Sequence, residues 1–115
     1  MAELMREDGD LVLRLSPIEK LGGLHGDIRV PLEAVQDVAV RRQPFGELRG
    51  IRAPGTGLPR RIALGTWRYR GGKDFAALYR GKPGVIVRLR GAPYRRLLVC
   101  ADDAGAVAAG IRAAA

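Results

Sequence analysis

Alternating apolar and polar positions recur along most of this chain, and they predict a protein built mainly of β-strands. Residues 1–9 lack the alternation and are predicted to be a flexible lead-in, which leaves residues 10–115 as a single domain. Strands are predicted at residues 10–15, 26–30, within 32–42, 49–53, 61–70, 73–79, 85–90 and 95–101. Glycine-rich turns separate the last four, which predicts a four-stranded antiparallel meander with a two-residue turn at Gly71-Gly72.

Two helices interrupt the strand pattern. Ser16 and Glu19 have the spacing of a capping box, so a helix is predicted to begin there and to stop at Gly22-Gly23. Asp102-Asp103 places acids at the start of a second helix, where the helix dipole favours negative charge. The apolar face of this second helix is formed by Ala104, Val107, Ala108 and Ile111.

In the strand at residues 61–70, the large apolar side chains change from even to odd positions at Gly65, which indicates a bulge. Trp67, Tyr69 and the odd positions of residues 85–89 are then predicted to face the core together. The arginines between them, at positions 68, 70, 88 and 90, are predicted to point outward together.

Positive charge is concentrated in one part of the chain. The formal net charge is +8, and residues 41–96 hold 15 of the 20 Lys and Arg but only two acids, Glu47 and Asp74. Residues 1–40 hold eight acids and four cations. A basic half on a small domain attracts polyanions. The alternative is a composition effect, because a chain with three Lys, one Ser and no Asn has the bias that GC-rich codons produce.

Successive hairpin loops lie at alternate ends of a sheet, so the turns at residues 71–72 and 91–94 are predicted to share one end. This end gathers the candidate site for an anion or an acidic partner. Arginine suits that role because its planar guanidinium binds phosphate or carboxylate through two hydrogen bonds. The competing interpretation is a solvated arginine-rich face, partly paired with the acidic N-terminal segment or with a neighbouring subunit. The candidate residues are Arg68, Arg70, Lys73, Arg88, Arg90, Arg95 and Arg96.

Other chemistries have little support in the sequence. His25 and Asp27 could act as a base and its orienting acid, but a loop histidine without a catalytic role is the favoured interpretation. Cys100 lies in an apolar run and is predicted to be a small buried hydrophobe. One His and one Cys do not make a structural zinc site, so no metal and no cofactor is expected. Tyr94 is the best candidate for an exposed aromatic that could stack on a nucleic-acid base.

The order of elements resembles that of bacterial pleckstrin-homology-like proteins of uncharacterised function. The resemblance rests on residues 11–15, 26–31, 35–40, 65–67 and 83–87 and on the helix after Asp102-Asp103. It implies an antiparallel β-barrel or two packed sheets, with a short helical turn after the first strand and a C-terminal capping helix. Proteins with this fold bind phosphoinositides, peptides or other proteins, or assemble into rings. Residues 16–27 lack the basic motif of the lipid-binding members, so phosphoinositide binding does not carry over.

The sequence therefore predicts a non-catalytic binding or assembly module that engages a protein partner or itself. The alternative is an anionic-ligand binder whose ligand is an acidic membrane surface or, with less support, a nucleic acid. An enzyme or flavin protein on another small barrel is a third class, disfavoured by the scarcity of polar catalytic residues. The acidic N-terminus and the lack of an apolar run of about 20 residues predict a cytoplasmic protein without a transmembrane segment.

Overall fold

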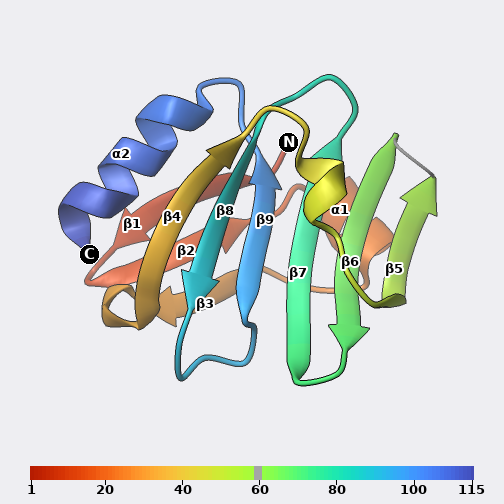
Figure 1. Ribbon diagram of the computed structural model, residues 1–115, viewed down its shortest axis with the longest axis horizontal. Helices are drawn as coiled ribbons and strands as arrows, with labels where there is room; N and C mark the ends of the chain where they lie inside the picture. The colour runs from red at the N-terminus through yellow and green to blue at the C-terminus, as the bar shows by residue number, and fades with distance from the viewer. Residues whose placement is uncertain (59–60) are drawn as a thin grey trace.

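The chain forms two β-sheets and two α-helices, which a computed structural model describes for residues 1–58 and 61–115 (Figure 1). A three-stranded antiparallel sheet contains β1 (Glu3–Glu7), β2 (Asp10–Arg14) and β3 (Ile28–Pro31), in that order. The larger sheet is formed by β4 (Val35–Arg41), β5 (Ile51–Leu58), β6 (Ile62–Tyr69), β7 (Gly72–Tyr79), β8 (Gly84–Leu89) and β9 (Arg96–Cys100). Its spatial order is β4-β8-β9-β7-β6-β5.

The two sheets pack face to face around the main hydrophobic core, which confirms the mainly β class with two packed sheets. Leu11, Leu13 and Val30 of the small sheet share this core with Phe75 and Leu97 of the large sheet. We call this face of the large sheet the inner face and the opposite one the outer face. The described strands make two separate sheets rather than a closed barrel.

The N-terminal residues belong to the fold instead of forming a flexible lead-in. Strand β1 pairs along its whole length with β2, from Glu3 opposite Arg14 to Glu7 opposite Asp10. Asp8 and Gly9 join the strands with positive φ angles of 49° and 82°, which a two-residue hairpin turn of type I′ requires. The Asp-Gly pair was the sequence signal for this hairpin, but the polar strand before it obscured the alternation.

Both predicted helices are present. Helix α1 (Pro17–Gly23) has the complete capping box of Ser16 and Glu19. Helix α2 (Ala104–Ala114) begins where the side chain of Asp103 accepts a hydrogen bond from the Ala106 N–H at 3.2 Å. Near its C-terminus, Arg112 donates to the Val38 carbonyl at 2.6 Å, so α2 covers the outer edge of β4. An edge strand covered in this way does not pair with another chain.

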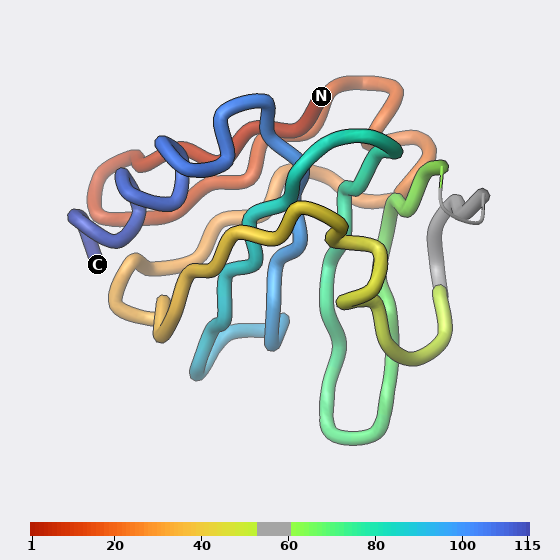
Figure 2. The backbone as a smooth tube through the Cα atoms, turned by 45° about the horizontal axis from the view of Figure 1, so that its top comes forward, coloured from red at the N-terminus to blue at the C-terminus, as the bar shows by residue number. Residues whose placement is uncertain are grey.

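The last four strands form two hairpins but not a continuous meander. Strands β7 and β9 are parallel neighbours, and β8 lies between β9 and β4. Alternation along one strand does not specify its neighbours, and β9 is buried on both faces, which suits a central position. Because β7 and β9 are parallel, the β6–β7 and β8–β9 turns still lie at the same end, as predicted (Figure 2).

Two local predictions on β6 were wrong. Tyr69 pairs with Gly72, so the hairpin turn is Arg70-Gly71 and not Gly71-Gly72. Strand β6 pairs with β7 in unbroken register, and the irregularity lies in its pairing with β5, between Arg52 and Gly55. The apolar residues change parity in β6 because both faces of the strand are covered, not because the strand is bulged.

A second, smaller core covers the outer face. Trp67, Ala76 and Leu98 belong to it, whereas Val85, Val87 and Leu89 belong to the main core on the inner face. Trp67 therefore does not share a face with the odd positions of β8. Residues 42–49, which we call the strap, cross this outer face and include the 3₁₀ helix η2 (Pro44–Glu47). Phe45 and Leu48 of the strap pack on the second core.

The end of the strap requires glycine at position 50, where φ is +84° and an added Cβ would lie 2.2 Å from the Arg68 carbonyl oxygen. Gly9 has a similar φ of +82° but open space around it. We expect Gly9→Ala to lower the free energy of unfolding by about 1 kcal/mol, from backbone strain alone. Gly50→Ala adds a collision with the backbone and should cost at least ~3 kcal/mol. Urea unfolding of the two variants checks this, and equal losses would contradict the close contact.

Candidate functional site

A buried ion pair anchors the outer face of the large sheet. Arg96 and Asp74 face each other on the parallel strands β9 and β7, and their side chains are only 9% and 1% exposed. The Arg96 guanidinium donates to Asp74 Oδ2 from Nε at 2.9 Å, and its Nη2 lies 2.8 Å from the same oxygen. Tyr69 donates its hydroxyl to Asp74 Oδ1 at 2.5 Å. Burial, followed by the hydrogen bond to Asp74, raises the pKa of Tyr69 and keeps it a neutral donor.

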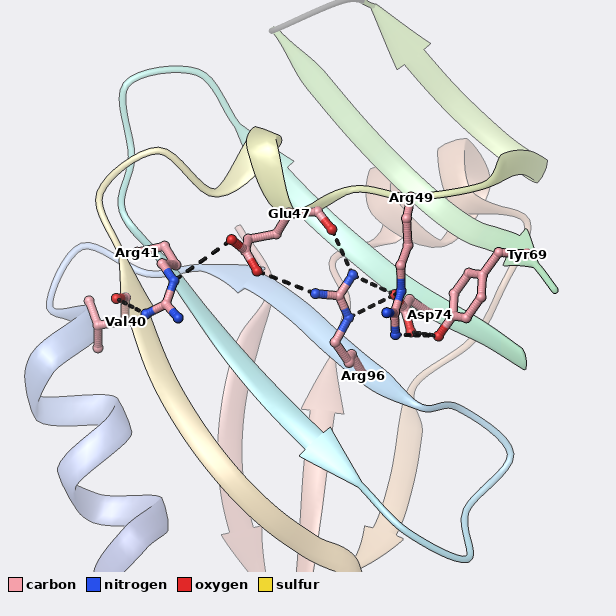
Figure 3. A network of polar contacts seen from close by, with 7 residues as sticks. All are labelled: Val40, Arg41, Glu47, Arg49, Tyr69, Asp74 and Arg96. Atoms are coloured by element: carbon pink, nitrogen blue, oxygen red, sulfur yellow. Dashed lines mark hydrogen bonds and ion pairs between the residues drawn. The ribbon is translucent and has the colours of Figure 1, made fainter. Parts of the chain in front are cut away.

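The same arginine holds the strap in place (Figure 3). Arg96 Nη2 donates to the Glu47 carbonyl oxygen at 2.6 Å, and Nη1 reaches the Glu47 carboxylate at 3.4 Å. At the end of the strap, Arg49 Nε donates to Asp74 at 3.3 Å, and its guanidinium lies 4.2 Å from the centre of the Tyr69 ring. Arg41 lies 3.7 Å from the other oxygen of Glu47. The C-terminal part of the strap is therefore fixed, through Glu47 and Arg49, to the side chains of one buried pair.

A row of charged residues crosses four strands on this face. Asp37 lies opposite Arg88, Arg88 lies opposite Arg96, and Arg96 lies opposite Asp74. Like charges on neighbouring strands are unfavourable, and here an acid flanks each end of the Arg88–Arg96 pair. Acids of the same sheet thus offset part of the positive charge of the two arginines, without an external anion.

The structure divides the seven predicted site residues instead of placing them in one outward set. Arg68 and Lys73 are paired on the inner face, whereas Arg88 and Arg96 lie on the outer face. Arg96 is buried and internally paired. The remaining three, in or beside the two turns at the shared end, are exposed and make no ion pair with a described residue: Arg70, Arg90 and Arg95.

The aromatic residues at the hairpin end of the sheet contact other residues of the protein. Tyr94 is 5% exposed, so it is not the exposed stacking residue that the sequence suggested. It lies under Lys73, whose Nζ is 4.9 Å from the ring centre, and against Phe75. The Tyr94 hydroxyl and His25 Nε2 are 2.8 Å apart. Asp27 instead accepts the Leu15 N–H at 2.8 Å, so His25 and Asp27 do not form a dyad.

A basic cleft with a volume of about 960 Å³ lies at the opposite end of the sheet. The strap forms one wall with Arg42, Gln43 and Gly46, and its Phe45 and Leu48, which pack on the second core, form an apolar floor. The other wall comes from the β7–β8 turn and the start of β6, which contribute Arg61, Tyr79, Arg80, Gly81 and Lys82. Its size is near the upper limit for small-molecule sites, roughly 300–1,000 Å³.

The charge of this basic cleft is one-sided. Four of the lining residues are cations, and no Asp or Glu is among the described residues that line it. Lys82 is paired with Asp102 at 2.5 Å. Within residues 1–58 and 61–115, the side chains of Arg42, Arg61 and Arg80 have no ion pair or hydrogen bond. Sequence reasoning missed this site because its arginines come from three separate segments, and only the general basic excess indicated it.

A buried carboxylate lies next to the lining of the basic cleft. Tyr79 turns its hydroxyl away from the cleft and donates it to Glu19, which is 2% exposed. Glu19 also accepts the N–H groups of Ala2 and Ser16, each at 2.8 Å. Burial opposes the ionisation of Glu19, but the hydrogen bonds from Tyr79, Ser16 and Ala2 outweigh it and lower its pKa. One carboxylate thus ties α1, the N-terminus and β7 together.

Cys100 lies close to this region but shows no sign of reactivity. It is fully buried, as predicted, and its thiol lies 3.5 Å from the Lys82 carbonyl oxygen. Burial raises the pKa of the thiol, which keeps it protonated and a poor nucleophile.

Neither the described helices nor the described polar clusters indicate a membrane span or a metal site. No described helix has the length and apolar character that crossing a membrane requires. The described residues also contain no group of three or more His, Cys, Asp or Glu placed to hold a metal ion. A scan against protein-family models and searches of curated proteins and of solved structures found no match to this chain.

The lowered pKa of Glu19 makes stability depend on pH. A carboxylate with a lower pKa in the folded than in the unfolded state stabilises the fold above its unfolded pKa, about 4.3. That contribution disappears as the pH falls through the folded pKa. We expect the free energy of unfolding to fall less steeply between about pH 5 and pH 3 in Glu19→Gln than in the native protein. Urea unfolding across this range measures the slopes. Glu33→Gln, at an exposed glutamate, should keep the native slope, and an unchanged slope in Glu19→Gln would contradict the role of Glu19.

Proposed function

We propose that this chain is a non-catalytic binding module that holds an anionic partner in the basic cleft. The observation that carries the proposal is the group of three arginines, Arg42, Arg61 and Arg80, gathered around one cleft, with no carboxylate of a described residue to neutralise them. Their mutual repulsion has no compensation within the described chain, whereas Arg96 and Arg49 elsewhere share the carboxylate of Asp74. An anion in the cleft would supply it.

The two walls are also built to keep their positions. The strap is fixed by Arg96 and Arg49, and on the opposite wall the Arg80 N–H donates to the Arg61 carbonyl oxygen at 2.9 Å. Binding to a preformed site loses less conformational entropy than binding to loops that must first become ordered. A fixed cleft whose charged groups are all positive therefore supports a binding role better than a catalytic one.

The test compares charge removal at the two ends of the large sheet. We expect Arg42→Ala/Arg80→Ala to weaken the binding of fluorescein-labelled poly-L-glutamate at least tenfold, because each lost charged hydrogen bond is worth about 1.5–3 kcal/mol. The matched control, Arg70→Ala/Arg90→Ala, removes the same charge at the hairpin end and should change the affinity less than twofold. Fluorescence anisotropy at about 50 and about 300 mM salt measures both.

Equal weakening by the two double variants would show that the probe senses only the net charge, and it would contradict a site in the cleft. Weakening by the Arg70/Arg90 variant alone would move the site to the hairpin end that the sequence favoured.

Self-association is a second candidate function, supported by a different observation. Ile18 and Leu21 lie three residues apart on α1, Leu24 follows the last residue of the helix, and the three are 80%, 76% and 64% exposed. Residues three apart share one face of a helix, so Ile18 and Leu21 form an apolar strip, with Leu24 at the end of the helix. Covering it with the same strip of a second copy would make a two-fold symmetric dimer.

We expect light scattering at about 100 µM protein to show a dimer, and Leu21→Glu to return the chain to a monomer, because the introduced charge cannot be buried in a helix–helix contact. Arg42→Ala should leave the dimer intact. A native chain that is monomeric at this concentration would exclude self-association through α1.

A further inference from the structure

The walls of the basic cleft require a ligand that carries more than one negative charge. Arg42 projects from the strap, whereas Arg61 and Arg80 belong to the facing wall, so the unpaired guanidinium groups lie on both sides. A single small anion bound to one wall would leave the other wall uncompensated. The arrangement fits separate carboxylates or phosphates spaced along one molecule.

The floor requires apolar groups in the same ligand. Phe45 and Leu48 are half-buried where the strap lies on the second core, and they line the cleft. The Tyr79 hydroxyl is already bound to Glu19, so it is not available to a ligand in the cleft. A bare polyanion would leave this apolar surface in contact with water, whereas aliphatic or aromatic groups would cover it.

The remaining lining favours a peptide over a nucleotide. Gln43 is the only amide side chain among the described residues of the lining, and amide side chains are the groups that read adenine. Gly46 and Gly81 stand on opposite walls, and nothing lies within 4 Å of the position that a Cβ would take on either. The main chain there is open to an extended segment, and the cleft is open to solvent instead of enclosing a small molecule.

Resting on the proposed function, we infer that the occupant of the basic cleft is a short acidic segment of a protein partner, in which Asp or Glu residues alternate with aliphatic or aromatic ones. The carboxylates pair with Arg42, Arg61 and Arg80, and the apolar side chains cover Phe45 and Leu48.

The experiment screens the full chain against an array of random 12-residue peptides and then measures affinities by fluorescence anisotropy. We expect the bound peptides to be enriched in both acidic and apolar residues. For the tightest peptide, replacing Asp and Glu by Asn and Gln should weaken binding at least tenfold, and so should replacing its apolar residues by Ser. Arg42→Ala/Arg80→Ala should weaken the parent peptide at least tenfold, and Arg70→Ala/Arg90→Ala less than twofold.

The comparison ligands are ATP and a 12-nucleotide oligothymidylate. If either binds the cleft more tightly than every peptide and depends on Arg42 and Arg80, the peptide assignment is overturned while the anion-binding function stands. If the Ser-substituted peptide binds as tightly as its parent, the apolar floor has no role and the ligand is a simple polyanion. If no anionic probe depends on Arg42 and Arg80, the proposed function itself fails.

Discussion

The buried ion pair between Asp74 and Arg96 is the interaction on which the outer face of the large sheet depends. A pair as little exposed as this one costs several kcal/mol to desolvate, and only good geometry and further hydrogen bonds offset that cost. Tyr69 and Arg49 donate further hydrogen bonds to the carboxylate, and the guanidinium donates to the Glu47 carbonyl oxygen. Because Glu47 and Arg49 belong to the strap, the hydrogen bonds that stabilise the buried ion pair also hold the strap in position.

That link connects the core to the site. The strap closes the second core with Phe45 and Leu48, and the same residues form the floor of the basic cleft. At the other end of the sheet, the cations favoured by the sequence are spread over two faces and two turns, with Arg96 used internally. The cleft gathers fewer cations, but its three guanidinium groups, which have no ion pair with a described residue, lie on two fixed walls around an apolar floor. We therefore place the binding function there.

Local signals in the sequence predicted the elements well. The capping box at Ser16, the acidic cap at Asp103 and the shared end of the two hairpins were all confirmed, because each depends on neighbouring residues or on simple alternation. Strand order was not predictable, since nothing in the apolar run of β9 indicates that it lies between β8 and β7. The basic cleft was missed for the same reason, because the contact of the strap with the start of β6 and the β7–β8 turn is made by tertiary packing alone.

The guanidinium of Arg96 holds the strap in place, and amide hydrogen exchange in Arg96→Lys tests this claim most directly. Lysine keeps the positive charge beside Asp74 but cannot bridge to Glu47 with a second planar arm. The reporter is the Leu48 N–H, which donates to the Phe45 carbonyl oxygen at 3.2 Å within the strap. We predict at least tenfold faster exchange at Leu48 and an unchanged rate at Val107 in α2. Native exchange rates at Leu48 in Arg96→Lys would contradict the claim.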